Sequence, residues 1–134
     1  MEFIRLLHPR NFDRERNRFN DLSFKALDGG VSVVHRECVD RIPSTICEHI
    51  RNYYRNETGE PPVFFLFQEE ILPEGYRIKA SVSTSGDPCH HDITNVSDNR
   101  LWKFFKRRAW TELYICDNGG FRPLKQTDID SFPN

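Results

Sequence analysis

The sequence predicts a single α+β domain of five or six mostly antiparallel strands and two helices, and three observations carry this prediction. The chain has 134 residues, which is the usual size of one domain with one core. Short apolar runs of strand length recur between turn residues along the chain. Two segments have apolar residues at helical spacing. We expect the domain to span residues 1–124, followed by a polar C-terminal tail at 125–134.

The strands are predicted from their length and pattern. The run VFFLFQ at 63–68 is continuously apolar, which is typical of a strand covered on both faces. YRIKASVST at 76–84 alternates like a half-buried strand, and we expect these two segments at the centre of the sheet. Asp28-Gly29-Gly30 predicts a hairpin turn between the strands that flank it. The predicted strands are 2–7, 22–27, 31–35, 63–68, 76–84 and 110–116.

The two helices are predicted at about 44–56 and about 98–108. Thr45 and Glu48 form a capping-box pattern at the start of the first helix. The second has an apolar arc opposite a basic side, as expected of a helix that packs one face on a core. Arg108 falls on the apolar arc, where a guanidinium needs a carboxylate partner or an anionic ligand. Arg108 is therefore a candidate phosphate-binding residue.

The charge balance argues against binding driven by the charge of the whole chain. With 19 Lys and Arg against 20 Asp and Glu, the net charge is −1, so any contact with nucleic acid must come from a local patch. No stretch approaches the roughly 18 apolar residues of a membrane span, so we expect no membrane partner. The N-terminus, MEFIRLLHPR, lacks the long apolar core of a secretory signal. We therefore expect a cytoplasmic protein.

Four cysteines occur without a secretory signal, which favours reduced thiols over disulfides. The alternative is a zinc site, for which Cys38, Cys47, Cys89 and His91 are the best ligands. Cys47 and His49 are two residues apart on the first predicted helix, so they point about 200° away from each other and cannot grip one ion. We expect no metal and no tightly bound cofactor.

The N-terminal segments carry most of the candidate site residues. FIRLLHP is followed by a loop that ends in NRFN, then by GGVSVVHRECVDR and a helix. This order, over about 50 residues, resembles the opening of the RES family of toxins, small relatives of ADP-ribosyltransferases. The resemblance implies Arg5 as the strand arginine, Arg18-Phe19-Asn20 as the Arg-aromatic-Asn segment, His35 at the place usually held by tyrosine, and Glu48 as the acidic helix residue.

Two kinds of chemistry can use these residues. If the resemblance holds, guanidinium groups bind the pyrophosphate of NAD and a ring stacks on its nicotinamide, with NAD as substrate. Alternatively, His8 and His91 act as general base and general acid on RNA, while Arg18 stabilises the transition state without a metal. Both alternatives stay open at the level of the sequence.

The function predicted from these residues is a small effector enzyme that acts on a nucleotide or a nucleic-acid phosphate, either ADP-ribosyltransferase-like or ribonuclease-like. The alternative is a non-catalytic protein-binding module such as an immunity protein, antitoxin or adaptor, since the chain has no glycine-rich phosphate loop and many aromatic residues. Nucleotide, RNA and a protein are the expected partners. The predicted catalytic residues are Arg5, His8, Arg18, His35, Glu48 and His91, and the predicted phosphate-binding residues are Arg18 and Arg108.

Overall fold

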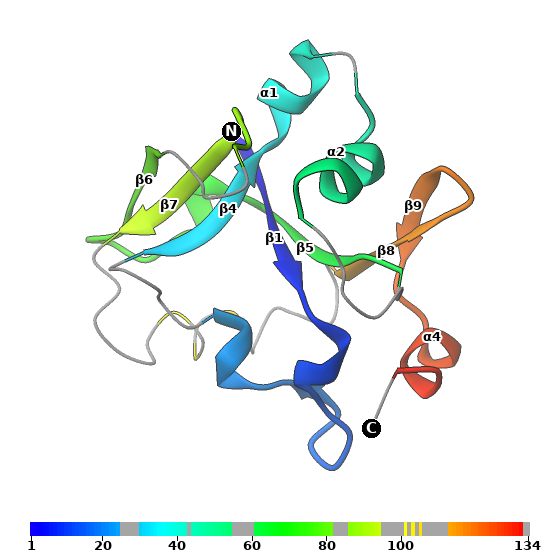
Figure 1. Ribbon diagram of the computed structural model, residues 1–134. Coiled ribbons are helices and arrows are strands. Elements are labelled where there is room, and N and C mark those ends of the chain that lie inside the picture. The colour runs from blue at the N-terminus through cyan, green and yellow to red at the C-terminus, as the bar shows by residue number, and fades with distance from the viewer. Residues whose placement is uncertain are drawn as a thin grey trace.

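A seven-stranded antiparallel sheet organises the molecule (Figure 1). The structure is a computed structural model that describes residues 1–24, 30–42, 44–54, 61–81, 86–94, 101, 103, 105 and 113–132. The strand order is β6-β7-β4-β1-β5-β8-β9. The strands are β1 (Glu2–Leu7), β4 (Val31–His35), β5 (Val63–Gln68), β6 (Arg77–Ala80), β7 (His90–Thr94), β8 (Leu113–Asp117) and β9 (Gly120–Pro123), and a separate two-stranded sheet joins β2 (Phe12–Asp13) to β3 (Arg18–Phe19).

Helical segments are short in the described part of the chain. The α-helices are α1 (Arg36–Arg41), α2 (Ile46–Tyr53) and α4 (Gln126–Asp130), and the 3-10 helices are η1 (Pro9–Asn11), η2 (Asp21–Phe24) and η3 (Glu69–Ile71). α2 begins where the Thr45 hydroxyl accepts a hydrogen bond from the Glu48 amide, which satisfies one of the free donors at the helix start. The architecture is therefore that of a single α+β domain.

The two faces of the sheet carry separate hydrophobic clusters, because successive side chains of a strand point to opposite faces. Ile4 and Phe64 face α1 and α2, which contribute Val39, Ile46 and Ile50 to that cluster. The other face is built from large rings, where the members include Phe3, Phe65, Phe67, Leu101, Phe105, Ile129 and Phe132. The many phenylalanines of the sequence thus serve mainly this second cluster.

The strands predicted at 2–7, 31–35 and 63–68 are confirmed, and β5 is covered on both faces as expected. β6 occupies an edge of the sheet and is largely exposed, so its prediction as a central strand is wrong. β7 and β9 were not predicted. Their addition raises the strand count of the main sheet above the expected five or six.

The predicted hairpin between 22–27 and 31–35 does not form in the described residues. Asp21–Phe24 is a 3-10 helix, and residues 25–29 lie outside the described part. β4 pairs instead with β7 along Val31–Val34 and with β1 at Val34 and His35. Long-range pairing has replaced the local pairing that the turn residues favoured.

The first predicted helix is confirmed over Ile46–Tyr53, whereas α1 was not predicted, since six residues carry little periodicity. Of the helix expected at 98–108, the described residues 101, 103 and 105 are helical. Leu101 and Phe105 are buried and Lys103 is exposed, in agreement with the predicted faces. Arg108 lies outside the described residues.

The segment expected as a polar tail contains α4. Ile129 and Phe132 are buried in the ring-rich cluster, at 3% and 7% exposure. Arg122 of β9 donates two hydrogen bonds of 2.8 Å to the Asp128 carboxylate, which holds the helix against the sheet. The buried side chains of this segment therefore pack in the core of the domain.

All four cysteines are paired, which corrects the expectation of free thiols. Cys38 is bonded to Cys89, and Cys47 to Cys116. Disulfides persist in non-reducing compartments, so a cytoplasmic location stays a prediction. No helix in the described part of the chain has the length and apolar character needed to cross a membrane.

Candidate functional site

The sheet opens between β1 and β4. β1 pairs with β5 at six positions but with β4 at only two, Phe3 with His35 and Ile4 with Val34. Beyond these pairs the two strands diverge (Figure 1). We call this place the strand opening. Backbone groups that would otherwise pair across it need other hydrogen-bond partners.

Arg5 supplies such partners within the strand opening. Its Nε donates to the Ser23 carbonyl at 3.0 Å, and its Nη1 donates to the Ser32 carbonyl at 2.8 Å. One side chain of β1 thereby connects η2 and β4. These bonds use two of the five N–H groups of a guanidinium, so it retains donors that no described residue engages.

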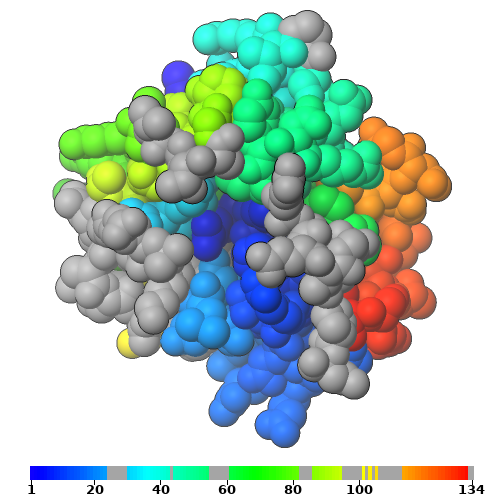
Figure 2. Space-filling model, in the orientation of Figure 1, coloured from blue at the N-terminus to red at the C-terminus, as the bar shows by residue number. Residues whose placement is uncertain are grey.

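Arg5 keeps its positive charge. Burial lowers the pKa of Arg5 to about 10, while the nearby Asp92 carboxylate acts in the opposite direction. A pKa near 10 leaves the guanidinium protonated at neutral pH. The space-filling view shows a hollow in the middle of this face, with β1 in dark blue at its floor (Figure 2). A positive charge on the strand that floors a hollow is suited to an anionic ligand.

A chain of hydrogen bonds, which we call the serine–histidine relay, starts at Ser32 on β4. Ser32 Oγ lies 2.6 Å from His90 Nε2, and His90 Nδ1 lies 2.7 Å from Ser81 Oγ. Ser81 donates in turn to Asp92 Oδ2 at 2.7 Å. Because the Ser81 hydroxyl donates to Asp92, its oxygen is free to accept from a proton on His90 Nδ1, and in that tautomer Nε2 can accept from the Ser32 hydroxyl. This is the geometry of a nucleophile beside an oriented base.

The serine–histidine relay lies next to Arg5 because Ser32 is hydrogen-bonded to both Arg5 and His90. Its carbonyl accepts from Arg5 and its hydroxyl contacts His90. Gly30 helps to position the far end of the relay, since a Cβ at this residue would lie 2.9 Å from the Cβ of Asp92. The arrangement can remove a proton from a hydroxyl while a cation stabilises negative charge nearby.

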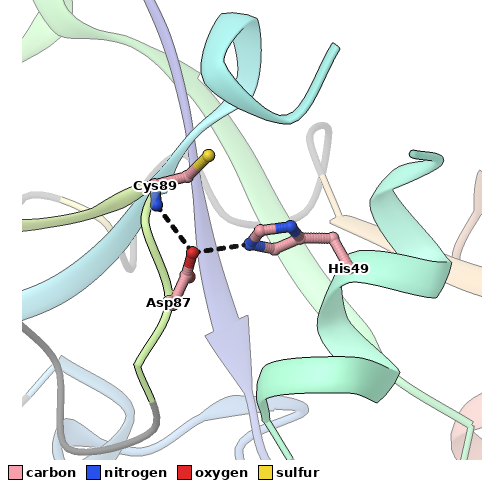
Figure 3. A group of neighbouring side chains, drawn as sticks. All are labelled: His49, Asp87 and Cys89. Carbon is pink, nitrogen blue, oxygen red and sulfur yellow. Dashed lines mark hydrogen bonds and ion pairs between the residues drawn. The ribbon is translucent and has the colours of Figure 1, made fainter. Parts of the chain in front are cut away.

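A second polar group, the histidine–aspartate cluster of His49, Asp87 and Tyr54, lies between α2 and the segment before β7. Figure 3 shows its His49–Asp87 pair. His49 Nε2 is 2.8 Å from Asp87 Oδ1, and the Tyr54 hydroxyl donates to Asp87 Oδ2. Burial alone would raise the pKa of Asp87, but the hydrogen bonds from His49, Tyr54 and the Cys89 amide outweigh it and lower that pKa. Burial, and then the bond to Asp87, raises the pKa of Tyr54. Asp87 is therefore a carboxylate at neutral pH.

Two of the predicted site residues, His35 and His91, lie together on the face of the sheet opposite the histidine–aspartate cluster. The rings of His35 and His91 are 5.2 Å apart, and His35 stacks on Phe3 at 5.1 Å. Burial, and then the neighbouring His91, lowers the pKa of His35. His35 Nε2 is buried and has no hydrogen-bond partner in the part of the chain that the structure describes. Arg5, two residues after Phe3, makes its hydrogen bonds with Ser23 and Ser32 instead.

The other predicted residues lie elsewhere. His8 is exposed just after β1, Glu48 is exposed in the first turn of α2, and Arg18 lies in β3, in register with Asp13. Arg108 is not among the described residues. Of the predicted set, His35 and His91 are brought into ring contact, whereas Arg5 bonds to Ser23 and Ser32.

The relay could not be predicted from the sequence, because β7 was not among the predicted strands. His90 and Asp92 are two residues apart, so in a strand they share one face, which is a signal that depends on recognising the strand. Of the four candidate zinc ligands, Cys38 and Cys89 are bonded to each other, but Cys47 pairs with Cys116 and the His91 ring packs against Phe3.

Comparisons of the chain with protein families, with curated proteins and with solved structures find no match.

Proposed function

We propose that the protein is a small enzyme that acts on a nucleotide or a nucleic-acid phosphate at the strand opening. The observation that carries the proposal is the meeting at Ser32 of a protonated arginine and a hydroxyl bonded to a histidine. Arg5 would bind phosphate oxygens with its remaining N–H groups, as guanidinium groups do. The resemblance of the N-terminal segments to RES toxins points to the same arginine.

The serine–histidine relay supplies the reacting group. As Ser32 Oγ attacks the substrate, His90 Nε2 takes its proton, and the hydrogen bond through Ser81 to Asp92 keeps the ring oriented. With RNA the attacked atom is phosphorus and the leaving group is a ribose hydroxyl. With NAD the attacked atom is the ribose carbon bonded to nicotinamide, which leaves. With RNA, His90 returns the proton to the leaving hydroxyl and then takes a proton from the water that hydrolyses the phosphoserine. With NAD, nicotinamide leaves uncharged, so His90 gives its proton to solvent before it activates the water that releases the product.

The proposal is tested by incubating the protein with radiolabelled NAD and, in parallel, with end-labelled RNA. We expect turnover of one of the two substrates by the wild type, and a loss of roughly 10²- to 10⁴-fold in His90→Gln, because the base is removed while hydrogen-bonding groups remain. Ser23→Ala is the matched control. Among the described residues its hydroxyl has no hydrogen-bond partner, and its backbone carbonyl, which holds Arg5, is kept in the variant, so full activity is expected.

Loss of nicotinamide from NAD would identify a transferase or glycohydrolase, and defined RNA fragments would identify a nuclease. Turnover of neither substrate, or equal activity of His90→Gln and the wild type, would contradict the proposal. The first result would instead favour a non-catalytic protein-binding module.

A further inference from the structure

We propose a second site, distinct from the strand opening, in which reduction of the Cys38–Cys89 disulfide creates a zinc site formed by Cys38, Cys89, His49 and Asp87. The inference does not depend on the proposed enzymatic function. It rests on the position of this disulfide against two buried side chains that are themselves good zinc ligands.

The ligand atoms are already close together. Single ligand atoms of His49, Asp87 and Cys89 all lie within 4.8 Å of one another, and Figure 3 shows the three side chains side by side, with His49 and Asp87 directed at each other. Zinc–ligand bonds of roughly 2.0–2.3 Å place tetrahedral ligand atoms roughly 3.3–3.8 Å apart. To seat the ion, the widest of these separations would shrink by about 1 Å, and the His49–Asp87 pair, now 2.8 Å apart, would open by roughly 0.5–1 Å. His49, Asp87 and Cys89 are 1%, 3% and 0% exposed, so the ion would be shielded from water.

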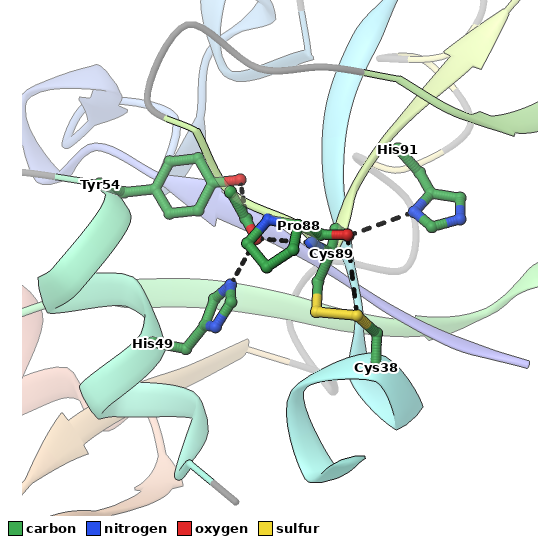
Figure 4. The surroundings of a disulfide bond; sticks show 7 residues. Cys38, His49, Tyr54, Pro88, Cys89 and His91 are labelled. Atoms are coloured by element: carbon green, nitrogen blue, oxygen red, sulfur yellow. Dashed lines mark hydrogen bonds and ion pairs between the residues drawn. A yellow bond between two sulfur atoms is a disulfide. The ribbon is translucent and has the colours of Figure 1, made fainter. Parts of the chain in front are cut away.

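Cys38 completes the set of four. It reaches Cys89 from α1, and the disulfide lies beside His49 and the segment at Pro88 (Figure 4). The fourth ligand thus comes from a different element than the other three. Two sulfurs, one imidazole and one carboxylate are within the ligand types that zinc accepts.

The carboxylate is oriented in advance by neighbours that are not ligands. The Tyr54 hydroxyl donates to Asp87 Oδ2, and the Cys89 amide donates to Asp87 Oδ1 at 2.7 Å. Hydrogen bonds of this kind fix the direction of a metal ligand and raise affinity. They also stabilise the negative charge that two thiolates and a carboxylate would place around the ion.

Redox state controls the site, because a sulfur in a disulfide lacks the negative charge of a thiolate, which is the form that binds metals. A dithiol reductant supplies two electrons and two protons: the Cys38–Cys89 bond breaks, two thiols form, and the reductant becomes a disulfide. Binding of Zn²⁺ then releases both thiol protons to solvent, and His49 binds as the neutral ring.

The second disulfide provides an internal control. Cys47 and Cys116 are also buried, but among the residues that the structure describes no group of histidine or acidic ligands surrounds them. We therefore expect metal binding at the Cys38–Cys89 pair and none at the Cys47–Cys116 pair.

Cobalt titration of the full chain tests the site, since thiolate–cobalt bonds give a charge-transfer absorption. After reduction with dithiothreitol and anaerobic removal of the reductant, we expect one equivalent of Co²⁺ to bind with this absorption, displaced by Zn²⁺. The oxidised protein should not bind. His49→Ala should weaken binding by at least roughly tenfold, because removal of even a residue that only hydrogen-bonds to a metal ligand lowers metal affinity by roughly 10- to 100-fold.

The double variant Cys47→Ser/Cys116→Ser is the matched control and should bind as the wild type does. Absence of the charge-transfer band, equal binding by oxidised protein, or an unchanged affinity in His49→Ala would each overturn the proposal.

A measurement on the wild type avoids any loss of folding in the variants. Zn²⁺ added to reduced protein should slow alkylation of Cys38 and Cys89, located by peptide mass spectrometry, and leave the rates of Cys47 and Cys116 unchanged. Protection of neither pair, or of both pairs equally, would contradict the assignment.

Discussion

At the scale of single residues, Arg5 combines a structural and a chemical task. Its guanidinium bonds two backbone carbonyls where β1 leaves β4, and its charge remains in place beside Ser32. A buried carbonyl that loses its donor costs about 1–3 kcal/mol. Any change at this residue therefore affects the fold as well as a bound anion.

Replacement of Arg5 by methionine should lower the free energy of unfolding by about 2–4 kcal/mol, because the Ser23 and Ser32 carbonyls lose their donor while the volume is roughly kept. Urea denaturation followed by circular dichroism measures the change. Arg10→Met, at an exposed position of η1, is the control and should have little effect. Equal stability of the two variants would show that the Arg5 bonds contribute little.

His35 should make the protein less stable in mild acid. Because burial and His91 lower the pKa of His35 in the folded protein, the unfolded chain binds the proton more readily below its own pKa of about 6.5. Stability should therefore fall as the pH drops below this value. In His35→Phe, which preserves a ring stacked on Phe3, the fall measured by thermal unfolding should be smaller. An identical pH profile for the variant would exclude His35 as the source.

At the scale of elements, α2 depends on a local signal at its start. The Thr45 hydroxyl accepts from the Glu48 amide, which would otherwise lack a partner. Thr45→Ala should cost about 1 kcal/mol of unfolding free energy. Ser44→Ala, one residue earlier and outside the cap, should cost less in the same denaturation experiment. The reverse order would contradict the assignment of the cap.

The elements that could be predicted from the sequence are those whose signals are local. VFFLFQ is apolar at nearly every position, and the Thr45–Glu48 pattern marks a helix start, so β5 and α2 were found. The sequence HHDIT of β7 has little apolar character, and it forms a strand by pairing with β4. The two strands are far apart in the chain: Ser32 and His90, which are hydrogen-bonded, are separated by 58 residues. Arg5 could be singled out by a resemblance, but its partners at Ser23 and Ser32 depend on where distant strands separate.

At the scale of the whole molecule, the disulfides fasten the two helices to the sheet region. One joins α1 to the residue before β7, and the other joins α2 to β8. Their sequence separations are 51 and 69 residues, so no local pattern could have indicated which cysteines pair. Links across long segments remove much conformational entropy from the unfolded chain.

Removal of one link should therefore be costly. Cys47→Ser/Cys116→Ser should lower the free energy of unfolding by about 2–5 kcal/mol relative to the oxidised wild type, measured by denaturant titration. Under reducing conditions the difference should shrink to the effect of the serine side chains alone. A variant as stable as the oxidised protein would show that this disulfide adds nothing to the fold.

The central claim is that Ser32 is an activated hydroxyl beside a cation, and reaction with diisopropyl fluorophosphate tests it most directly. Attack of Ser32 Oγ on phosphorus expels fluoride and leaves a stable adduct, which peptide mass spectrometry can locate. We predict labelling at Ser32 in the wild type and in Ser23→Ala, and its loss in His90→Gln, where Ser32 has no base. An unlabelled Ser32 in the wild type, or equal labelling in His90→Gln, would contradict the account.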